Sequence, residues 1–291
     1  MTARIVVWGE LLWDRFPDGA QLGGAPANVA WHLAMMGARP ALASRVGDDD
    51  DGRQARARLA ARGVDVSAVG VDPERATGEV EVTVAGGEPR YRLVPGRAWE
   101  RIALDAPARA ALAGAVAVVF GTLAQRTDDG LAAWRAMIAA APPGCLRVCD
   151  PNLRPGALDP RALDAALAAA DVVKLNDAER RALAERAGSD PVATLLARGA
   201  RLVAVTHGAR GATLHTPAGE HAVAATPAAP GGDNVGCGDA FVAALVLGLA
   251  AGWPLARTGA LASRWAAAVA GRRGATPDFP AAAISAMLGA P

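Results

Sequence analysis

The sequence is poor in several residues on which common functional sites depend. It has three cysteines and four histidines in 291 residues, and neither set shows a metal-ligand spacing. No Gly-x-Ser-x-Gly segment is present, so the nucleophile turn of an α/β hydrolase is absent. Lys174 is the single lysine, and it is not part of the Gly-Lys-Ser/Thr core of a P-loop. Disulfide frameworks, zinc centres, hydrolytic triads and P-loop chemistry are therefore disfavoured.

Long apolar runs and a strong charge imbalance are also missing. The longest apolar run, 241–253, is too short to cross a bilayer, and the first ten residues lack the apolar core of a signal peptide. The formal net charge of +1 argues against nucleic acid as the main partner. We therefore expect a cytoplasmic protein whose partners are small molecules, with no membrane and no nucleic acid among them.

What the sequence does contain is an alternation of short β-branched runs and alanine-rich segments. The predicted strands are 5–8, 116–120, 146–149, 171–175 and 201–206. The predicted helices include 129–140, 160–169 and 177–186. Strands that alternate with helices and are apolar along their length predict an α/β fold with a parallel sheet covered on both faces.

Two segments interrupt this alternation. Residues 78–94 alternate valine with polar side chains and turn at 85–89, which predicts a half-solvated antiparallel hairpin. Residues 10–22 are irregular and contain the turn signal Pro17-Asp18-Gly19. The two segments could pair as a small sheet that projects from the main body as a lid. An ordinary surface hairpin fits the pattern equally well.

The most informative segment is GDNVGCGDAF, residues 232–241. The apolar run that follows is spaced as a buried helix, so Gly236-Cys237-Gly238 opens that helix with backbone N–H groups that lack a partner inside it. These groups and the positive end of the helix dipole form a seat for an anion. Asp239 places a general base beside this seat, as phosphoryl transfer to a hydroxyl requires. The common alternative is a glycine-rich turn that binds nothing.

Polar residues follow several predicted strands at the end where parallel sheets bind ligands. Asn176 and Glu179 offer oxygen ligands for a hydrated Mg²⁺ that bridges phosphates, and the same pair also fits a helix capping box. Arg154 can offset phosphate charge through its planar guanidinium. Gly208 and Gly211 allow the backbone to approach a ligand closely. We therefore expect one polar cleft at this edge of the sheet.

A second glycine-rich segment precedes a predicted helix near the N-terminus. Gly23 and Gly24 permit close backbone contact, and Asn28 presents both donor and acceptor atoms. With Asp14, these groups could grip several hydroxyls of a polyol, because each hydroxyl both donates and accepts a hydrogen bond. The alternative is a helix start with a glycine-rich entry and no ligand.

Taken in chain order, these motifs resemble the ribokinase-like carbohydrate kinases, the phosphofructokinase B group. The family's Asp-Thr-x-Gly-Ala-Gly-Asp signature is similar to residues 233–239, and its Gly-Gly-x-x-x-Asn motif is similar to residues 23–28. Further correspondences, in family order, are Gly47-Asp48, the 150–154 loop, Asn176-x-x-Glu179 and the 206–211 segment. The likeness spans nearly the whole chain.

The resemblance implies a three-layer αβα sandwich with a mostly parallel central sheet and a small β-sheet lid. It implies one kinase domain over residues 1–291, with lid segments near 10–25 and 76–100. The implied activity is ATP-dependent phosphorylation of a sugar hydroxymethyl group, with ATP and Mg²⁺ as cofactors.

The same resemblance assigns roles around the transferred group. Asp239 resembles the base that takes the hydroxyl proton, and Gly236, Cys237 and Gly238 resemble the anion hole. Asp233 looks like part of a K⁺ loop in family members that use one. Cys237 stands where the family usually has Ala, which backbone N–H groups tolerate, and its thiol suggests sensitivity to thiol reagents. Asn234 stands for the usual Thr and leaves cation dependence open.

Two ligand sites are implied as well. The residues that resemble the nucleotide site are Asn176, Thr206, Gly208 and Gly211, with Glu179 organising Mg²⁺ through water. The residues that resemble the sugar site are Asp14, Gly23, Gly24 and Asn28, to which we add Arg154.

Within the family, the segments 8–14, 22–30 and 120–126 look most like fructokinases. The expected acceptor is therefore β-D-fructose and the expected product fructose 6-phosphate. Arg97 and Trp99 follow the hairpin and could close over the sugar, or they could pack the lid.

Other functions stay open at this stage. A kinase for another acceptor, such as 2-keto-3-deoxygluconate or a nucleoside, fits the same motifs, and so does a sugar or nucleotide sensor without catalysis. A Rossmann dehydrogenase is disfavoured, since no Gly-x-Gly-x-x-Gly follows the first strand. The sequence does not fix the oligomeric state, although an exposed lid edge can pair across a homodimer.

Overall fold

The computed structural model describes residues 4–85, 88–153 and 158–289, and within them a nine-stranded sheet forms the centre of the fold. Its strand order is β13-β12-β11-β10-β9-β8-β1-β4-β5. The parallel strands are β1 (Arg4–Trp8), β4 (Arg39–Gly47), β5 (Val69–Asp72), β8 (Ala117–Phe120), β9 (Leu146–Cys149), β10 (Val172–Asn176) and β11 (Leu202–Thr206). The antiparallel strands at one edge are β12 (Ala212–Thr216) and β13 (Gly219–Val223).

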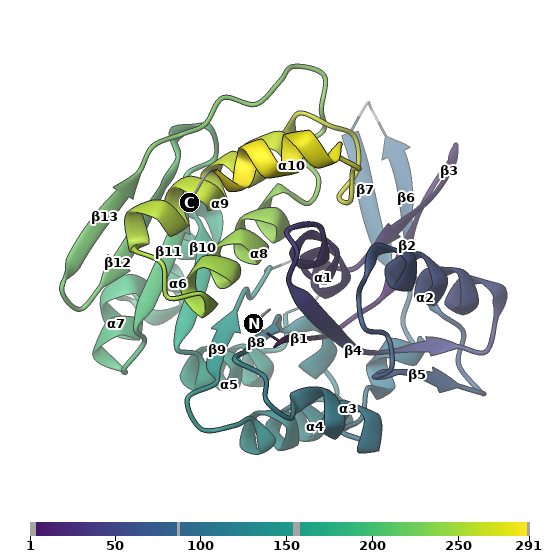
Figure 1. Ribbon diagram of the computed structural model, residues 1–291. Helices are drawn as coiled ribbons and strands as arrows, with labels where there is room; N and C mark the ends of the chain where they lie inside the picture. Colours follow the sequence, from purple (N-terminus) through teal and green to yellow (C-terminus); the bar gives the residue numbers. More distant parts are fainter. Residues whose placement is uncertain (1–3, 86–87, 154–157, 290–291) are drawn as a thin grey trace.

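Helices cover both faces of this sheet (Figure 1). One face carries α1 (Ala25–Met35), α2 (Asp50–Arg62), α8 (Cys237–Ala250), α9 (Leu255–Ala270) and α10 (Ala281–Leu288). The other carries α3 (Ala106–Leu112), α4 (Asp128–Ala140), α5 (Pro160–Ala169), α6 (Asp177–Ala187) and α7 (Pro191–Ala197). The predicted α/β class, with a mostly parallel sheet between two helical layers, is confirmed.

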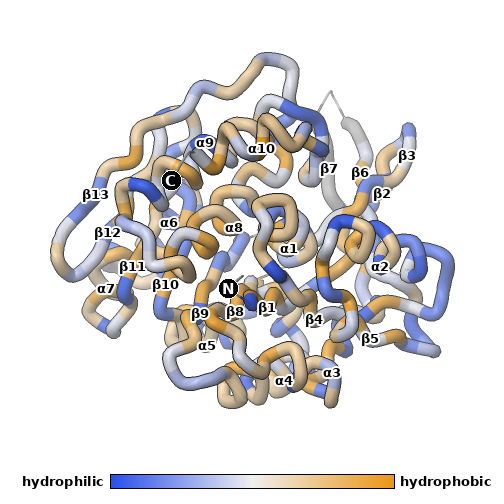
Figure 2. Tube along the Cα trace, viewed as in Figure 1, coloured by the Kyte–Doolittle hydropathy of each residue, from blue (hydrophilic) through white to orange (hydrophobic). Residues whose placement is uncertain are grey.

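The strands are apolar on both sides because each side faces a helical layer. In β1, Ile5 and Val7 belong to one buried cluster, whereas Val6 and Trp8 belong to the other. This alternation is the two-residue period of a strand, with both faces in the core. Figure 2 shows the resulting concentration of apolar residues along the central strands and α8.

A separate four-stranded sheet, ordered β3-β2-β6-β7, projects from one side of the main body (Figure 1). Its strands are β2 (Leu12–Phe16), β3 (Gly19–Gly23), β6 (Gly78–Ala85) and β7 (Glu88–Leu93). β6 and β7 form the predicted antiparallel hairpin, and β2 pairs with β6 in parallel. The predicted pairing of the two irregular segments into one small sheet is therefore confirmed, and we call this sheet the lid.

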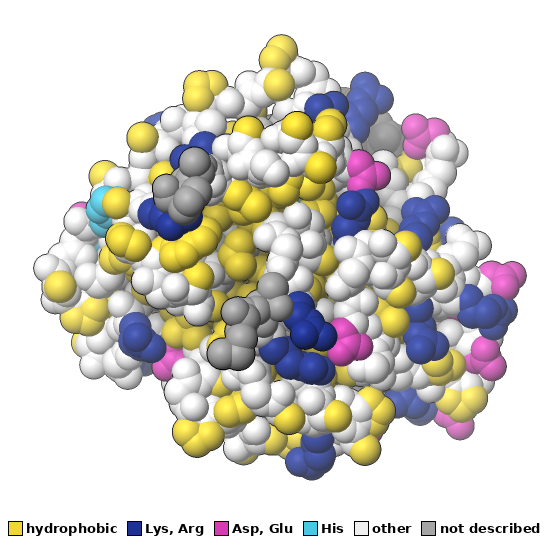
Figure 3. Space-filling view, in the orientation of Figure 1, with side chains coloured by type: hydrophobic (Ala, Val, Ile, Leu, Met, Phe, Trp, Pro, Cys, Tyr) yellow, Lys and Arg dark blue, Asp and Glu magenta, His cyan; other side chains and the backbone are white. Residues whose placement is uncertain are grey.

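The surface agrees with the near-neutral charge of the sequence. Figure 3 shows acidic and basic side chains interspersed on one face, around α2 and the lid. Across the described residues, no helix combines the length and apolarity that crossing a membrane requires.

His32 in α1 is completely buried and links this helix to the C-terminal segment. Its Nε2–H donates to the carbonyl oxygen of Ala275 at 2.9 Å, and its ring meets Trp265 edge-on. Burial lowers the pKa of His32 to about 4, and the hydrogen bond to Ala275 opposes this only in part. The ring is therefore neutral in the folded protein and becomes charged mainly on unfolding.

We predict that His32 makes the protein less stable in acid. Because its folded pKa lies below the ordinary value of 6.5, the unfolded chain binds the extra proton first as the pH falls. Between pH 8 and pH 5, this one group should remove about 2 kcal/mol of unfolding free energy. Urea unfolding at both pH values measures it. In the variant His32→Gln, the drop in unfolding free energy between pH 8 and pH 5 should be smaller by this amount. An equal drop in the variant would show that His32 does not cause it.

Candidate active site

The glycine-rich turn Gly236–Gly238, which we call the anion turn, begins α8 as predicted. Gly236 is the residue before the helix and has a φ of 74°, in the left-handed region that glycine tolerates. None of the described side chains caps this helix end. Its first backbone N–H groups therefore have no partner within the helix and can bind an anion there.

Asp239 lies in the first turn of α8 and contacts α1. The Nδ2 atom of Asn28 donates to Oδ2 of Asp239 at 2.8 Å, which fixes the carboxylate between the two helix starts. The Oδ1 atom of Asn28 is buried and finds no hydrogen-bond partner among the described residues. Asn28 can therefore hold the base and still accept a hydrogen bond from a ligand hydroxyl.

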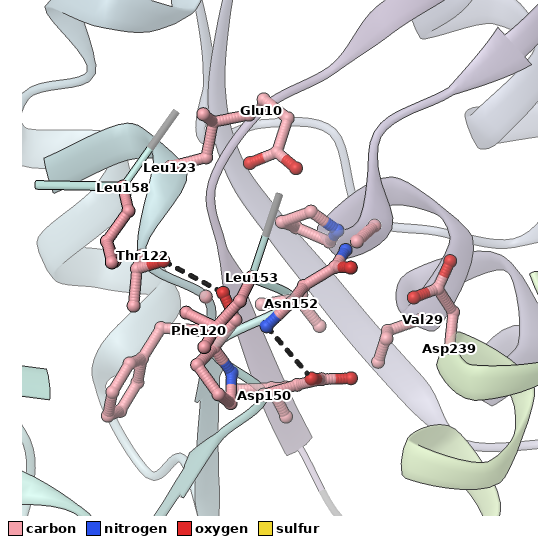
Figure 4. A pocket seen from close by; sticks show the side chains of 16 residues that line it. Glu10, Val29, Phe120, Thr122, Leu123, Asp150, Asn152, Leu153, Leu158 and Asp239 are labelled. Carbon is pink, nitrogen blue, oxygen red and sulfur yellow. Dashed lines mark hydrogen bonds between the residues drawn. The ribbon is translucent and has the colours of Figure 1, made fainter. Parts of the chain in front are cut away.

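A first pocket, which we call the carboxylate pocket, lies in front of Asp239. Figure 4 shows the carboxylates of Glu10, Asp150 and Asp239 directed toward it from three different elements. Asn152 also lines it, with a φ of 43° and its backbone N–H donating to Asp150 Oδ1 at 3.2 Å. Val29 and other apolar side chains complete the wall. Carboxylate and amide groups against apolar walls suit a polyhydroxylated ligand.

A second, wider cavity lies on the other side of the anion turn. It has a volume of about 420 Å³, within the range of small-molecule sites. The predicted residues that line it are Thr206, Gly208, Gly211, Cys237 and Gly238. At Gly211, with a φ of 93°, a Cβ atom would collide with the carbonyl oxygen of Val223, so only glycine fits. The anion turn thus borders the wide cavity, while Asp239, the next residue, borders the carboxylate pocket.

Asn176 and Glu179 begin α6 with a complete capping box. The Asn176 side chain accepts from the Glu179 N–H, and Glu179 Oε2 accepts from the Asn176 N–H, both at 2.8 Å. Glu179 Oε1 accepts from the Leu153 N–H at 2.9 Å. Burial raises the pKa of Glu179, with Lys174 opposing this. The capping interpretation is correct for both residues.

This arrangement also bears on a metal ion. Each carboxylate oxygen of Glu179 already accepts one backbone hydrogen bond, so a remaining lone pair can accept from a water of a hydrated ion. Nowhere in 4–85, 88–153 or 158–289 do three or more His, Cys, Asp or Glu residues cluster as a metal site. Through its remaining lone pairs, Glu179 can hold a hydrated Mg²⁺ ion by way of a water molecule.

Lys174 is a central residue of the site that the sequence analysis did not assign to it. Its Nζ lies 3.2 and 3.4 Å from the two carboxylate oxygens of Asp150, and the side chain is almost fully buried. Burial alone lowers the pKa of Lys174, but the carboxylates of Asp150, Glu179 and Asp239 outweigh it and raise the pKa. The lysine is therefore charged. Its position within the apolar strand sequence VVKLN gave no sign of this role.

Asp233 and Asn234 shape the approach to the anion turn. Asp233 accepts from the Val235 N–H at 3.0 Å and from the Gly274 N–H at 2.9 Å, so it ties the turn to the 272–274 segment. Asn234 has a φ of 58°, where asparagine is tolerated and a β-branched residue is strained. This backbone conformation explains why Asn suits the position at which the family usually has Thr.

The predicted sugar-site residues lie where the lid meets the main body. Asp14 in β2 packs against Gly23 in β3, and a Cβ atom on Gly23 would collide with its carboxylate. Gly24, with a φ of 99°, lies against the carbonyl of Glu10 in the same way. Glu10 is a pocket residue that the sequence analysis missed, although its place directly after β1 was a usable signal.

Three other predicted residues have different outcomes. Arg97 pairs with Glu79 of β6, at the base of the lid. Trp99 is completely buried under Gly78 and beside Arg126, which is the lid-packing role that the sequence analysis left open for it. Arg154 lies outside the described residues.

Comparisons with known proteins agree with this geometry. A sequence profile described as pfkB family carbohydrate kinase matches residues 19–282. A fructokinase of Klebsiella pneumoniae is 34% identical over an alignment of 274 positions, which covers 86% of this chain and 86% of that protein.

Two solved structures share the fold over nearly their full length. A fructokinase from Vibrio cholerae O395, with fructose, ADP and calcium ion bound, is 26% identical with a TM-score of 0.78 and covers 99% of both chains. An uncharacterized sugar kinase from Pyrococcus horikoshii in complex with ATP is 27% identical with a TM-score of 0.81 and covers 94% of both. The family predicted from the motifs is confirmed. This chain belongs to the pfkB family of carbohydrate kinases, and it is a phosphotransferase that acts on an alcohol group.

Proposed function

We propose that the protein transfers the γ-phosphoryl group of ATP to a hydroxymethyl group of fructose. The observation that carries this proposal is the anion turn, which borders the wide cavity on one side and adjoins Asp239 in the carboxylate pocket on the other. A phosphoryl group that passes from one pocket to the other must cross the turn. The acceptor then lies beside Asp239 and the nucleotide in the wide cavity.

The residues predicted for the anion turn and the two ligand sites have separate roles in this transfer. Asp239 takes the proton of the attacking hydroxyl, and the N–H groups of Gly236–Gly238 bind the transferring oxygens. Asp14, Gly23, Gly24 and Asn28 orient the sugar together with Glu10, and Arg154 offsets phosphate charge. Asn176, Thr206, Gly208 and Gly211 hold the nucleotide. When bound, Mg²⁺ supplies charge neutralisation between the phosphates, and Glu179 positions one of its waters.

Fructose is favoured as the acceptor by two relatives. The Klebsiella pneumoniae protein is a fructokinase, and the Vibrio cholerae structure contains fructose with ADP. The carboxylate pocket has an unfilled volume of about 30 Å³, which is enough for water but too little for a hexose. Sugar entry therefore requires the side chains that line this pocket, such as Asn152 and Leu153, to move aside.

An acceptor panel tests this proposal. ADP release is measured with fructose, ribose, 2-keto-3-deoxygluconate and a nucleoside, each against a reaction without acceptor. We expect the highest kcat/KM for fructose, with fructose 6-phosphate as the product. A low rank for fructose would remove it as the acceptor. Sugar binding without ADP release from any acceptor would instead favour a sensor.

Two further proposals concern an ion and a partner. Asp233 belongs to a loop that binds K⁺, because its carboxylate joins the 233–235 and 272–274 segments beside the anion turn. Activity in K⁺ compared with tetramethylammonium tests this.

The edge strands of the lid, β3 and β7, can pair with a second copy, and the mass in solution reports whether a homodimer forms.

The thiol of Cys237 offers a direct test of where the nucleotide binds. Cys237 lines the wide cavity, and burial, followed by the charge of Asp239, raises the pKa of its thiol. We predict slow inactivation by N-ethylmaleimide at pH 7, faster inactivation at higher pH as the thiolate forms, and protection by ATP. Cys237→Ala should keep turnover within a few-fold and resist the reagent. Equal inactivation of that variant, or no protection by ATP, would contradict this placement.

A further inference from the structure

Lys174 lies directly beneath the anion turn. Its Nζ is 3.3 Å from the position that a Cβ atom on Gly238 would take, so the absence of a side chain there lets the ammonium approach the turn. On its other side, Lys174 is held by both oxygens of Asp150. The ammonium is therefore fixed between the carboxylate pocket and the N-terminal end of α8.

Several carboxylates surround the Lys174 ammonium before any phosphate arrives. The carboxylates of Asp150, Glu179 and Asp239 all act on the one ammonium. A phosphoryl group at the anion turn adds further negative charge in a buried setting, where electrostatic interactions are stronger than in water. A fixed cation beneath the turn offsets this charge without having to reorganise during the reaction.

Stability alone gives little reason for a buried lysine at this position. Removing two charges from water costs several kcal/mol per ion, and well-packed apolar residues often replace a buried ion pair without loss of stability. The other residues of β10 before Asn176 are apolar and buried, so an apolar side chain would suit the strand. A functional reason for the ammonium is therefore worth testing.

We propose that Lys174 is a positioning residue for phosphoryl transfer, whose ammonium, anchored by Asp150 beneath Gly238, stabilises the negative charge that gathers at the anion turn in the transition state. This inference rests on the proposed transfer across the turn. It differs from a counter-ion role, in which Lys174 only neutralises Asp150 and has no effect on the turn.

Kinetics separate the two roles. The variants are Lys174→Met, Lys174→Arg, Asp150→Asn and the double variant Lys174→Met/Asp150→Asn, with Arg186→Met as the control. Arg186 pairs with Asp164 on the surface, so its removal changes the net charge equally without touching the site. We expect Lys174→Met to lower kcat on the order of 100-fold with KM for ATP nearly unchanged, and Lys174→Arg to recover part of the loss.

The double variant is the decisive comparison, because it removes the two charges together and leaves neither Lys174 nor Asp150 without its ion-pair partner if a single variant folds poorly. If Lys174 acts on the turn, the double variant should be on the order of 100-fold slower than Asp150→Asn alone. Equal kcat values for these two variants would overturn the proposal, since Lys174 would then serve Asp150 only. Thermal unfolding confirms that both are folded.

A binding measurement keeps the test independent of the acceptor. ADP affinity is measured by calorimetry with and without aluminium fluoride, which mimics the transferring phosphoryl group. We expect aluminium fluoride to tighten ADP binding in the unmodified protein and much less in Lys174→Met, while ADP alone binds both equally. The same tightening in both proteins would overturn the proposal. If every acceptor fails, the proposed function fails, and the aluminium fluoride comparison still decides the role of Lys174.

Discussion

We expect turnover in the variant Asp239→Asn to fall by at least about 100-fold, with the affinity for ATP close to that of the unmodified protein. The asparagine side chain has nearly the same shape and can still meet Asn28, but it cannot take a proton from the acceptor hydroxyl. The proposed nucleotide site is the wide cavity on the other side of the anion turn, so we expect nucleotide binding to be spared. Steady-state ADP release and calorimetric titration of ATP measure the two quantities.

A matched control separates the loss of the general base from the loss of a negative charge near the start of a helix. Asp128 is an exposed residue in the first turn of α4 and pairs with Arg161 on the surface. Asp128→Asn removes the same charge from the first turn of another helix, and we expect turnover to stay unchanged. Near-normal turnover of Asp239→Asn would show that Asp239 is not the base.

Much of the main sheet could be predicted because its strands are short apolar runs. The predicted strand 146–149 coincides with β9 and the predicted helix 160–169 with α5. The other strands predicted for the main sheet, and the helices 129–140 and 177–186, agree to within one residue at each end. β4, β5, β12 and β13 were not predicted, and β4 shows a reason. It begins Arg-Pro-Ala-Leu-Ala-Ser, and alanine and proline disfavour strands in isolation. Pairing with β1 on one side and β5 on the other decides its conformation.

The site could be predicted where its residues are neighbours in the chain. The anion turn and Asp239 lie within four positions, so helix geometry alone places the base beside the unpaired amides. The contact between Asn28 and Asp239 joins residues 211 positions apart, and Lys174 meets Asp150 across two neighbouring strands. Only the assembled sheet brings such pairs together, so no local pattern could reveal them.

Gly236→Ala should be the most damaging small substitution in the anion turn. At a φ of 74°, a side chain is strained, and a Cβ atom would lie 2.5 Å from the Cα atom of Ala275. Strain and collision together should cost roughly 3 kcal/mol of unfolding free energy. Because the turn or the backbone at Ala275 must shift, the N–H groups no longer point at the transferring phosphoryl group. We therefore expect kcat to fall on the order of 100-fold. Urea unfolding and ADP release measure the two losses.

Gly252 provides the control, because it isolates backbone strain from collision. It has a φ of 68° beyond the C-terminal end of α8, and a Cβ atom there would meet nothing within 4 Å. Gly252→Ala should therefore cost about 1 kcal/mol and leave kcat unchanged. The difference between the two variants is then the cost of moving the anion turn against Ala275. The two variants could instead have the same stability and the same kcat. Catalysis would then not depend on the observed position of the anion turn, and charge stabilisation by its N–H groups would be excluded.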